Sequence, residues 1–377
     1  MKLSHSKLGT ILSCPMTYYL SYIEGIAKKD EKPALAIGSA VHWGIEHDTE
    51  DLTEYFIKNG TVKSRDNYTR DQLLAEAMVH GYRKHKDEIF DEMLTNNETG
   101  EKYELLEETH ELYVTGELPC AISDEPHKFV GIVDLLLLTN KGFIVIDYKT
   151  SSYAPNWNSY LDQIYRYIFM LNTMFPDVPI IKIGIINLRK TSIRQKKTEN
   201  ESQFLNRMKF EYDVNDENYV NYHEYEVSAL NQQLVDDYTT NLAKQCDLAH
   251  MIDEKGIRFI NFAAAEGTYG KSDFWDIFYR TPDAHVLYSI RDKVWNEDEQ
   301  KLDTRRDCRP IDMRLIDGKC FNHYEYFEEI VSKHQINVAL DYFLDEVKDA
   351  IKEEGYEFVD DDLLVLYDET YRKLHSC

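Results

Sequence analysis

Long apolar runs are missing from this 377-residue sequence. No stretch of eighteen consecutive apolar residues occurs, so the sequence offers no candidate for a membrane-spanning helix. The first residues, Met1 to His5, also lack the apolar core of a secretory signal. From these two absences we expect a soluble, cytoplasmic protein that makes no contact with a membrane. The chain should nevertheless be globular, because 43% of its residues are hydrophobic and 27 of them are tyrosines.

Closely spaced cysteines and a phosphate-binding loop are absent as well. The six cysteines are scattered and form no C-x-x-C pair; they are Cys14, Cys120, Cys246, Cys308, Cys320 and Cys377. In a cytoplasmic protein we expect such residues to be reduced thiols rather than disulfides. The motif G-x-x-x-x-G-K-[ST] does not occur, so any step driven by ATP would need a partner protein.

Positive charge is scarce. The sequence has 43 lysines and arginines against 68 aspartates and glutamates, which gives a formal net charge of −25. Such a chain is not expected to bind nucleic acid tightly and indiscriminately, because cationic side chains supply most of the non-specific affinity for phosphate. Local charge still decides what a single groove can bind. The negative net charge is therefore compatible with one localised contact to nucleic acid, or with a partner protein that supplies the DNA.

The stretch from 131 to 149 is where the sequence first indicates a chemistry. Two apolar runs, at 131–138 and 143–149, flank a turn at Asn140-Lys141-Gly142 and predict a β-hairpin. Charged residues interrupt these otherwise buried strands at three positions: Asp134, Asp147 and Lys149. An unpaired buried charge is costly, so these groups need partners or a ligand.

Asp147 and Lys149 are two residues apart, so both side chains point to the same face of their strand. If Asp134 lies beside them, two carboxylates can hold a hard cation, and the Tyr148 carbonyl can add a third oxygen. The ammonium would then lie beside the attacking water. This arrangement favours cleavage of phosphodiesters. A simple buried ion pair between the aspartate and the lysine is the alternative.

Two helical patterns flank the hairpin. Upstream, Gly38 and His42 form the pattern G-x-x-x-H, and Glu46 follows His42 at the spacing of one helical face. Downstream, Gln163 and Tyr167 are also four residues apart, at the start of a predicted helix. Each pattern therefore presents two polar side chains on one side of a helix.

The chain thus contains G-x-x-x-H, G-x-x-D, D-x-K and Q-x-x-x-Y in this order, within about residues 1 to 190. This combination resembles the PD-(D/E)xK nuclease superfamily, specifically its RecB-type branch of exonucleases. The resemblance implies a Mg²⁺- or Mn²⁺-dependent exonuclease that hydrolyses DNA in recombination, repair or phage DNA metabolism. It implies metal binding by His42, Asp134, Asp147 and the Tyr148 carbonyl. The catalytic residues that it implies are Asp134, Asp147, Lys149, Gln163 and Tyr167.

Within this resemblance Lys149 orients or activates the attacking water, and Gln163 and Tyr167 position either the phosphate or Lys149. Two further carboxylates, Glu111 and Glu117, belong to a strand predicted at 108–118. They are either additional metal ligands or exposed strand residues.

Cys14, followed by a proline and several aromatic residues, also resembles RecB-type nucleases, in many of which this cysteine binds an iron–sulfur cluster. The other cysteines of that pattern are missing from the corresponding segment, 269–278. Because such clusters are held by thiolates, we expect no iron–sulfur cluster. The cysteines are interpreted as structural thiols, and the alternative is a displaced metal site built from Cys14, Cys308 and Cys320, with His323 nearby.

The order strand, hairpin, helix, strand predicts an α/β fold. We expect a restriction-endonuclease-like mixed β-sheet core flanked by helices, with a helical C-terminal extension. The nuclease core should occupy 1–225 with a helical insertion at about 47–107, and a mainly helical region at 226–377 should wrap around it. In that region the apolar pattern predicts helices at 231–253, 274–279, 284–296 and 336–354.

A basic segment follows the strand predicted at 180–188; its cationic residues are Arg189, Lys190, Arg194, Lys196 and Lys197. We interpret it as the edge of a DNA-binding groove, where cations contact phosphates. A solvated basic loop is the alternative.

A catalytically inactive nuclease fold that binds DNA or protein is the rival hypothesis. The acidic balance and the missing cysteines favour it, whereas the complete set of predicted catalytic residues favours an enzyme. If the protein is an exonuclease, the absence of a helicase motif predicts that unwinding depends on a helicase or recombination protein as partner.

Overall fold

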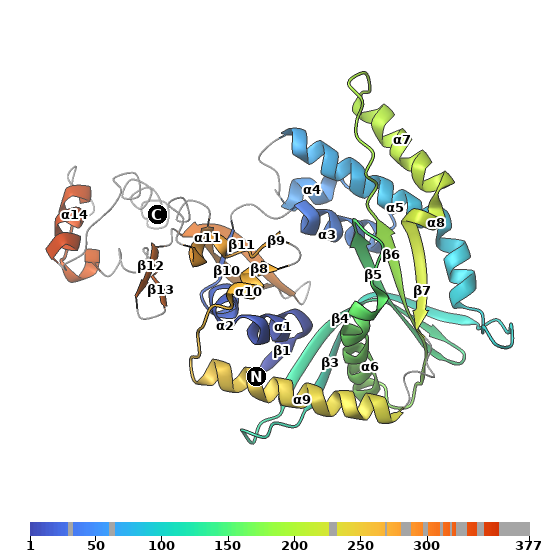
Figure 1. The fold of residues 1–377 in the computed structure, drawn as a ribbon, viewed down its shortest axis with the longest axis horizontal. Coiled ribbons are helices and arrows are strands. Elements are labelled where there is room, and N and C mark those ends of the chain that lie inside the picture. Colours follow the sequence, from blue (N-terminus) through green and yellow to red (C-terminus); the bar gives the residue numbers. More distant parts are fainter. Residues whose placement is uncertain are drawn as a thin grey trace. The chain divides into compact units, whose positions relative to one another are not determined.

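Figure 1 shows the computed structural model of the chain, in which the described residues are 1–28, 33–59, 65–225, 232–267, 270–279, 288–296, 301–309, 312–316, 319–321, 330–337 and 343–353. The chain divides into two compact units: Met1–Leu8 with Asp30–Met251, and Gly9–Lys29 with Ile252–Cys377. Every residue predicted for the metal and catalytic site belongs to the first unit.

Within the described residues, a six-stranded mixed sheet forms the centre of the first unit. The strand order is β1-β4-β5-β6-β7, and β3 pairs with the remaining edge of β4. The strands are β1 (Lys2–Ser4), β3 (Leu105–Leu118), β4 (His127–Thr139), β5 (Gly142–Ser151), β6 (Ile180–Arg189) and β7 (Val220–Tyr225). The β1–β4 and β5–β6 pairs are parallel and the others antiparallel. The predicted hairpin and mixed sheet are therefore confirmed.

The strand β4 has two partners along the same edge. Near its start, residues 128–130 pair with β1, and near its end, residues 135–139 pair with β5. The ladder between β4 and β5 ends at the pair Leu135–Ile146. One step farther along, the backbone N–H of Tyr148 donates to the Asp134 carboxylate instead of to a strand carbonyl. The strands thus part where the charged residues begin.

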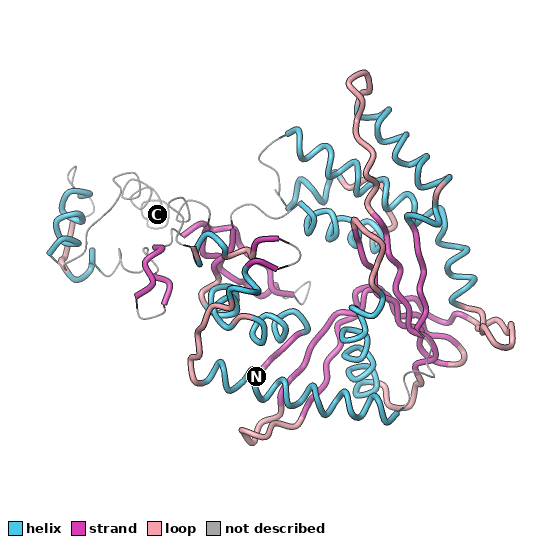
Figure 2. The backbone as a smooth tube through the Cα atoms, in the orientation of Figure 1, coloured by secondary structure: helices cyan, strands magenta, loops and turns pink. Residues whose placement is uncertain are grey.

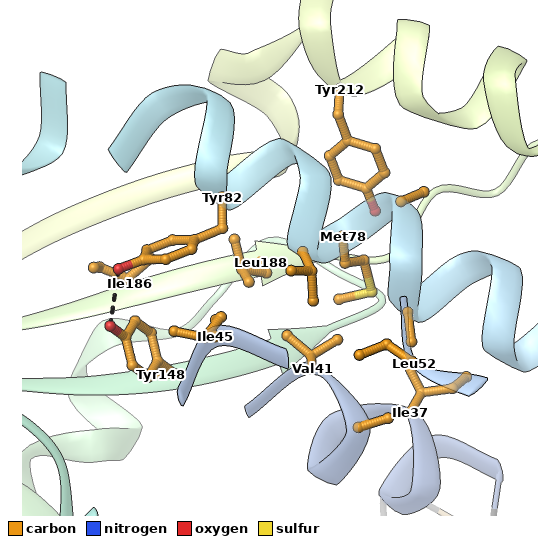
Figure 3. Close-up of a cluster of buried hydrophobic side chains, with 14 of the residues drawn as sticks. Ile37, Val41, Ile45, Leu52, Met78, Tyr82, Tyr148, Ile186, Leu188 and Tyr212 are labelled. Atoms are coloured by element: carbon orange, nitrogen blue, oxygen red, sulfur yellow. Dashed lines mark hydrogen bonds between the residues drawn. The ribbon is translucent and has the colours of Figure 1, made fainter. Parts of the chain in front are cut away.

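Helices cover both faces of this sheet (Figures 1 and 2). On one face α3 (Pro33–Glu46), α5 (Arg65–Met93) and α7 (Glu201–Val214) share an apolar core with the sheet (Figure 3). Its members include Ile37, Val41, Ile45, Met78, Ile186, Leu188 and Tyr212. Each such side chain contributes about 1.5–3 kcal/mol when it is fully buried. The other face carries α6 (Leu161–Met174), and α9 (Gln232–Glu254) lies beside α6 through stacked Tyr165 and Tyr238.

Alternation along β5 directs its charged residues away from the apolar core. Ile146 and Tyr148 belong to the core shared with α3 and α5, so Asp147 and Lys149 point to the α6 face. The hydroxyls of Tyr148 and Tyr82 lie 3.0 Å apart and anchor β5 to α5 (Figure 3). The turn before β5 needs Gly142, because its φ is 144° and an added Cβ would lie 2.2 Å from the Pro179 carbonyl oxygen.

The remaining helices of the described residues are short. They include α1 (His5–Ser13), α2 (Pro15–Tyr18), a π-helical turn (Tyr19–Ile23), α4 (Thr53–Asn59), a 3₁₀ turn (Trp157–Tyr160), α8 (Asp216–Tyr219), α10 (Phe262–Ala265), α11 (Trp275–Phe278) and α14 (Phe343–Glu353). Ser4 begins α1, since its hydroxyl accepts the N–H of Lys7 at 3.3 Å. In the part of the chain that the structure describes, no helix has the length and apolar composition to cross a bilayer.

The second unit contains strands as well as helices. In its described residues β2 (Ile26–Lys28), β10 (Tyr288–Asn296) and β11 (Lys301–Arg309) form one sheet. Two-stranded pairs join β8 (Glu266–Gly267) to β9 (Gly270–Lys271), and β12 (Asp312–Ile316) to β13 (Lys319–Phe321). A small core that includes Cys14, Leu20, Phe274 and Tyr288 holds the unit together.

One helix prediction for this region is wrong. Residues 288–296 form the strand β10, because Tyr288, Ile290 and Val294 recur at even spacing, and β11 supplies the hydrogen-bonding partner. Residues 284–287 lie outside the described part. The helices predicted at 231–253 and 274–279 are confirmed in their described parts by α9 and α11, and α14 confirms the later part of the one predicted at 336–354, whose residues 336–337 are not helical.

Candidate active site

Asp147 and Lys149 lie side by side on the α6 face of β5. Asp147 is buried, with only 1% of its surface exposed, and Lys149 Nζ lies 2.5 Å from its Oδ2. The ammonium offsets part of the cost of burying the carboxylate. Among the described residues Oδ2 has no hydrogen-bond partner besides this ion pair. The ammonium of Lys149 therefore holds one oxygen of Asp147, and α6 holds the other.

Gln163 and Tyr167 reach the same carboxylate from α6. Gln163 Nε2 donates to Asp147 Oδ1 at 2.9 Å, and Gln163 Oε1 accepts from Lys149 Nζ at 3.0 Å. The Tyr167 hydroxyl donates to Asp147 Oδ1 at 3.2 Å. Burial and the charge of Asp147 raise the pKa of Tyr167 well above its ordinary value, so the hydroxyl remains a donor. The helix pattern and the D-x-K pattern thus meet in one network.

His42 and Asp134 form a second pair beside this network. His42 Nδ1 lies 3.8 Å from Asp134 Oδ2, which also accepts the N–H of Tyr148 at 2.7 Å. Burial raises the pKa of Asp134 well above its usual value, and the charge of Asp147 raises it further. Burial lowers the pKa of His42, although the charge of Asp147 acts in the opposite direction. His42 is therefore a neutral imidazole at neutral pH, which is the form that binds metals.

Glu111, which the sequence left open between a metal ligand and an exposed residue, lies beside this pair. One ligand atom each from His42, Glu111 and Asp134 fall within 4.8 Å of one another. The φ of Glu111 is 50°, a left-handed value that is uncommon for a residue other than glycine and that occurs at functional sites. Glu117, in contrast, is exposed and pairs with Lys128 near the start of β4.

These side chains fit a hard divalent cation. Carboxylates and an imidazole are suitable ligands for Mg²⁺ or Mn²⁺. Among the described residues Asp147 Oδ2 is buried with no hydrogen-bond partner besides the Lys149 ion pair, and burial together with the charge of Asp147 raises the pKa of Asp134. A cation would satisfy the first group and relieve the repulsion at the second. The donor set therefore agrees with the metal that the motifs imply.

The glycines of the two motifs allow the helices to approach the sheet closely. A Cβ on Gly38 of α3 would lie 3.1 Å from Thr150 Oγ1, next to Lys149 in β5. A Cβ on Gly131 of β4 would lie 2.8 Å from Met170 Cε on α6. Contacts this short force a neighbour to move. Glycine at these positions brings His42 and Tyr167 within reach of the strands.

The basic segment leaves the sheet at the end that carries Lys149. Arg189, the last residue of β6, pairs in register with Ser151, which is two residues beyond Lys149. Arg189 and Lys190 are partly buried, whereas the segment's other cations, Arg194, Lys196 and Lys197, are exposed. Arg207 braces the segment through an ion pair with Glu199 and a hydrogen bond to the Arg194 carbonyl. Three cations thus remain open to solvent in the loop that follows β6.

Cys14 lies in the core of the second unit. Its Sγ is 3.8 Å from the Phe259 carbonyl oxygen and 3.4 Å from the Asn261 nitrogen. These contacts agree with a structural thiol. The side chains of Cys308 and Cys320 and residue His323 lie outside the described part, so the displaced metal site stays a prediction.

Asn187 is a residue to which sequence reasoning gave no role. It is completely buried, at 0% exposed, and pairs in register with Lys149 on the neighbouring strand β6. Within the described part of the chain, neither its Nδ2 nor its Oδ1 has a hydrogen-bond partner. The available signal was a polar residue in the apolar run 180–188, the same signal that identified Asp134.

We expect Asn187→Leu to make the protein more stable and less active. Removing an unsatisfied buried amide should raise the free energy of unfolding by about 1–3 kcal/mol. Cleavage should fall in the same variant, because the amide lies on the strand position next to Lys149, where it can contact water or phosphate. Urea unfolding and a DNA cleavage assay measure the two effects. A destabilised variant with unchanged activity would contradict this interpretation, and Ile185→Leu, on the same strand face, is the control.

A mixed sheet flanked by helices, with an acidic group and a lysine on adjoining strands, is the architecture of a nuclease-fold protein. Residues 2–256 match the sequence profile of the PD-(D/E)XK nuclease superfamily. The match spans more than half of the chain, and the protein belongs to this superfamily.

Two solved structures are similar to the chain at low scores. The crystal structure of a “putative exonuclease” from Eubacterium rectale is 12% identical, with 66% of this chain and 81% of that chain covered and a TM-score of 0.41. The protein SSO0001 is also 12% identical, with 56% and 75% covered and a TM-score of 0.22. At these scores the two structures add nothing to the family assignment. No curated protein matches the chain.

Proposed function

We propose that this protein is a metal-dependent deoxyribonuclease that hydrolyses DNA from strand ends. The observation that carries the proposal is the network of Asp134, Asp147, Lys149, Gln163 and Tyr167. It buries a carboxylate whose Oδ2 is in contact with an ammonium, which is costly for stability and useful for phosphodiester hydrolysis. Membership of the nuclease superfamily supports the same reaction class.

His42, Asp134, Asp147 and the Tyr148 carbonyl would hold Mg²⁺ or Mn²⁺, and we add Glu111 to this set because of its position. When bound, the cation supplies the Lewis acidity that activates water and stabilises negative charge on the phosphate. The position of Glu111 next to Asp134 also explains why its strained backbone would be retained.

The other residues of the network orient the reactants. Lys149 orients the attacking water and donates to the phosphate oxygen on which negative charge develops. Gln163 holds the ammonium of Lys149 and the carboxylate of Asp147 at once, and Tyr167 donates to the same oxygen of Asp147 as Gln163 does. As the water oxygen bonds to phosphorus, the bond to the leaving oxygen breaks; the attacking water gives a proton to solvent, and the leaving oxygen takes one up from solvent.

The assignment to the RecB-type branch, and with it an exonuclease of recombination, repair or phage DNA metabolism, rests on the four motifs and their order. We propose a helicase or recombination protein as partner. The same proposal includes a nuclease core at 1–225 and a C-terminal region at 226–377.

A catalytically inactive module that binds DNA or protein is the second candidate. The net charge of −25 favours it. It predicts that Mg²⁺ and Mn²⁺ bind without dependence on Asp134 and Asp147, or do not bind. The two candidates therefore differ in a metal titration of the Asp134→Asn and Asp147→Asn variants as well as in catalysis.

A cleavage assay with Mn²⁺ tests the proposal. Its substrates are end-labelled linear DNA, both single- and double-stranded, and a closed circular DNA. We expect the wild type to degrade only linear DNA and Lys149→Ala to be inactive, and the order of label release gives the polarity. Cleavage of the circular DNA would contradict the assignment as an exonuclease, but it would still support the assignment as a nuclease. Intact substrates in every wild-type reaction would favour the binding module.

Neutralising the exposed cations of the basic segment should weaken DNA binding more than it slows cleavage. In the triple variant Arg194→Ala, Lys196→Ala, Lys197→Ala, each lost phosphate contact should reduce the slope of log affinity against log salt by about 0.7–0.9. KM should rise while kcat changes little. The matched control is Lys102→Ala with Lys141→Ala, two exposed lysines at the opposite end of β5. Equal slopes for both variants would show that the segment is a solvated loop.

A further inference from the structure

A second group of side chains that could bind a metal lies at the start of β4. Cys120, His127 and His250 each offer one ligand atom, and these atoms lie within 4.8 Å of one another. His127 is the first residue of β4 and Asp134 is the eighth, so the two groups are roughly 23 Å apart along the strand. All three residues belong to the first unit. The group is therefore separate from the candidate active site.

His127 is oriented like a metal ligand. It is completely buried, at 0% exposed, and its Nε2 lies 2.9 Å from Asp247 Oδ1. The carboxylate accepts the proton of Nε2, so Nδ1 is the nitrogen with the free lone pair. Nδ1 is buried and has no hydrogen-bond partner among the described residues. A carboxylate that fixes one ring nitrogen while the other binds the ion is the usual environment of a metal-bound histidine.

Cys120 and His250 approach each other at a distance that suits a shared ion. Cys120 Sγ lies 3.8 Å from His250 Nδ1. With Zn–S of about 2.3 Å and Zn–N of about 2.0 Å, two ligands of a tetrahedral zinc ion are roughly 3.5 Å apart. The rings of His127 and His250 are 5.5 Å apart at an angle of 78°. Small side-chain movements would bring all three ligand atoms onto one ion.

The surrounding contacts hold these residues together. Cys120 lies on the connection between β3 and β4, whereas Asp247 and His250 lie one turn apart on α9. The N–H of Ala121 donates to Asp247 Oδ1 at 3.0 Å, and Ser123 Oγ donates to Cys120 Sγ at 3.3 Å. These contacts tie the β3–β4 connection to α9 beside the three ligand atoms.

A catalytic triad of cysteine, histidine and aspartate does not fit this group. In such a triad a single imidazole contacts both the nucleophile and the carboxylate. Here His250 contacts the thiol and His127 contacts Asp247, so no single ring relays a proton between them.

We propose that Cys120, His127 and His250 bind Zn²⁺, that Asp247 orients His127, and that the ion joins the β3–β4 connection to α9. One thiolate with two imidazoles is a donor set that suits zinc. The fourth tetrahedral position belongs to water. The ion would hold a connection whose residues 121–126 are all exposed, and its binding releases the thiol proton to solvent.

Cobalt titration of the reduced, full-length chain tests this proposal, because Co²⁺ bound to a thiolate gives a charge-transfer band in the near ultraviolet. We expect this band in the wild type, its displacement by stoichiometric Zn²⁺, and its loss in Cys120→Ser. Cys246→Ala, which removes a neighbouring thiol on α9, is the matched control and should keep the band. Asp147→Asn should also keep it, which separates this site from the candidate active site.

His250→Asn and Asp247→Asn provide independent tests should Cys120→Ser fold poorly by circular dichroism. His250→Asn should abolish tight zinc binding, and Asp247→Asn should weaken zinc affinity roughly 10- to 100-fold. Zn²⁺ should raise the Tm of the wild type and of Cys246→Ala, but not that of Cys120→Ser or His250→Asn. Absence of a thiolate band in the wild type, or a band that persists in Cys120→Ser, would overturn the proposal.

Discussion

A Lys149→Met protein should cleave DNA at least about 10²- to 10³-fold more slowly than the wild type, because one preorganised donor to the developing charge is worth this much. Lys149 Nζ lies 2.5 Å from Asp147 and 3.0 Å from Gln163 Oε1, so its position is held by two groups. Methionine keeps the length of the side chain and removes the charge. Single-turnover cleavage with saturating Mn²⁺ isolates the chemical step from DNA binding.

Lys86→Met is the matched control for this variant. Lys86 also pairs with a carboxylate, Glu108, and its side chain is 33% exposed, against 23% for Lys149. It lies on α5 and makes no contact with Asp147. Its loss should leave the rate within about twofold of the wild type, since a partly exposed ion pair contributes at most about 1 kcal/mol. Comparable rates for Lys149→Met and wild type would remove the central residue of the proposed mechanism.

Asp134→Asn should stabilise the protein in the absence of metal and abolish its stabilisation by Mn²⁺. Burial and the nearby charge of Asp147 raise the pKa of Asp134, so its ionised form destabilises the fold. The amide oxygen of asparagine can still accept the N–H of Tyr148. Without metal at pH 8 the variant should therefore have the higher Tm. With Mn²⁺ the order should reverse, because a cation stabilises only a site that binds it.

The sign of the pH dependence follows from the direction of the shift. The pKa of Asp134 is raised in the folded state relative to its ordinary value of 3.8, which holds in the unfolded chain. The contribution of this carboxyl group to the free energy of unfolding is therefore fully present below pH 3.8 and is lost as the pH rises through the pKa of the folded state. The Tm difference between Asp134→Asn and wild type should thus be small near pH 4 and grow toward pH 8. Mn²⁺ affinity should increase over the same range, because the proton on Asp134 must leave.

Thermal unfolding by circular dichroism, with EDTA or with Mn²⁺, measures these effects. Asp213→Asn serves as control, because this carboxylate pairs with His80 on the surface and no burial penalty is relieved there. A variant that is less stable than wild type at pH 8 without metal would show that Asp134 is a structural anion rather than a ligand.

Sequence patterns predicted the central part of the fold because their signals are local. Two apolar runs around a turn at Gly142 predicted β4 and β5, and the four-residue spacing of Gln163 and Tyr167 predicted one face of α6. Local signals failed at 288–296, where the pairing partner β11 decides for a strand. The same residues carry both helix-compatible and strand-compatible patterns, and a long-range hydrogen-bond ladder selects between them.

Residues whose role depends on a distant neighbour were either left open, as Glu111 was, or not predicted. Glu111 belongs to a strand with many carboxylates, and its register opposite Asp134 distinguishes it from Glu117. Asn187 gains its importance from the parallel pairing that brings it next to Lys149. Cys120 and His250 are 130 positions apart, and no spacing rule for metal ligands covers such a distance.

By itself the sequence determined which residues carry charge into buried strands, which helix faces are polar, and that no P-loop or cysteine pattern is present. These properties depend on residues only a few positions apart, because the repeat of two residues in a strand and of 3.6 residues in a helix decides which face each side chain lies on. Only the tertiary structure decided that β5 parts from β4 at Asp134, that Glu111 joins His42 there, and that α9 meets the β3–β4 connection. Such contacts depend on strand register and on helix docking, which the whole core determines together.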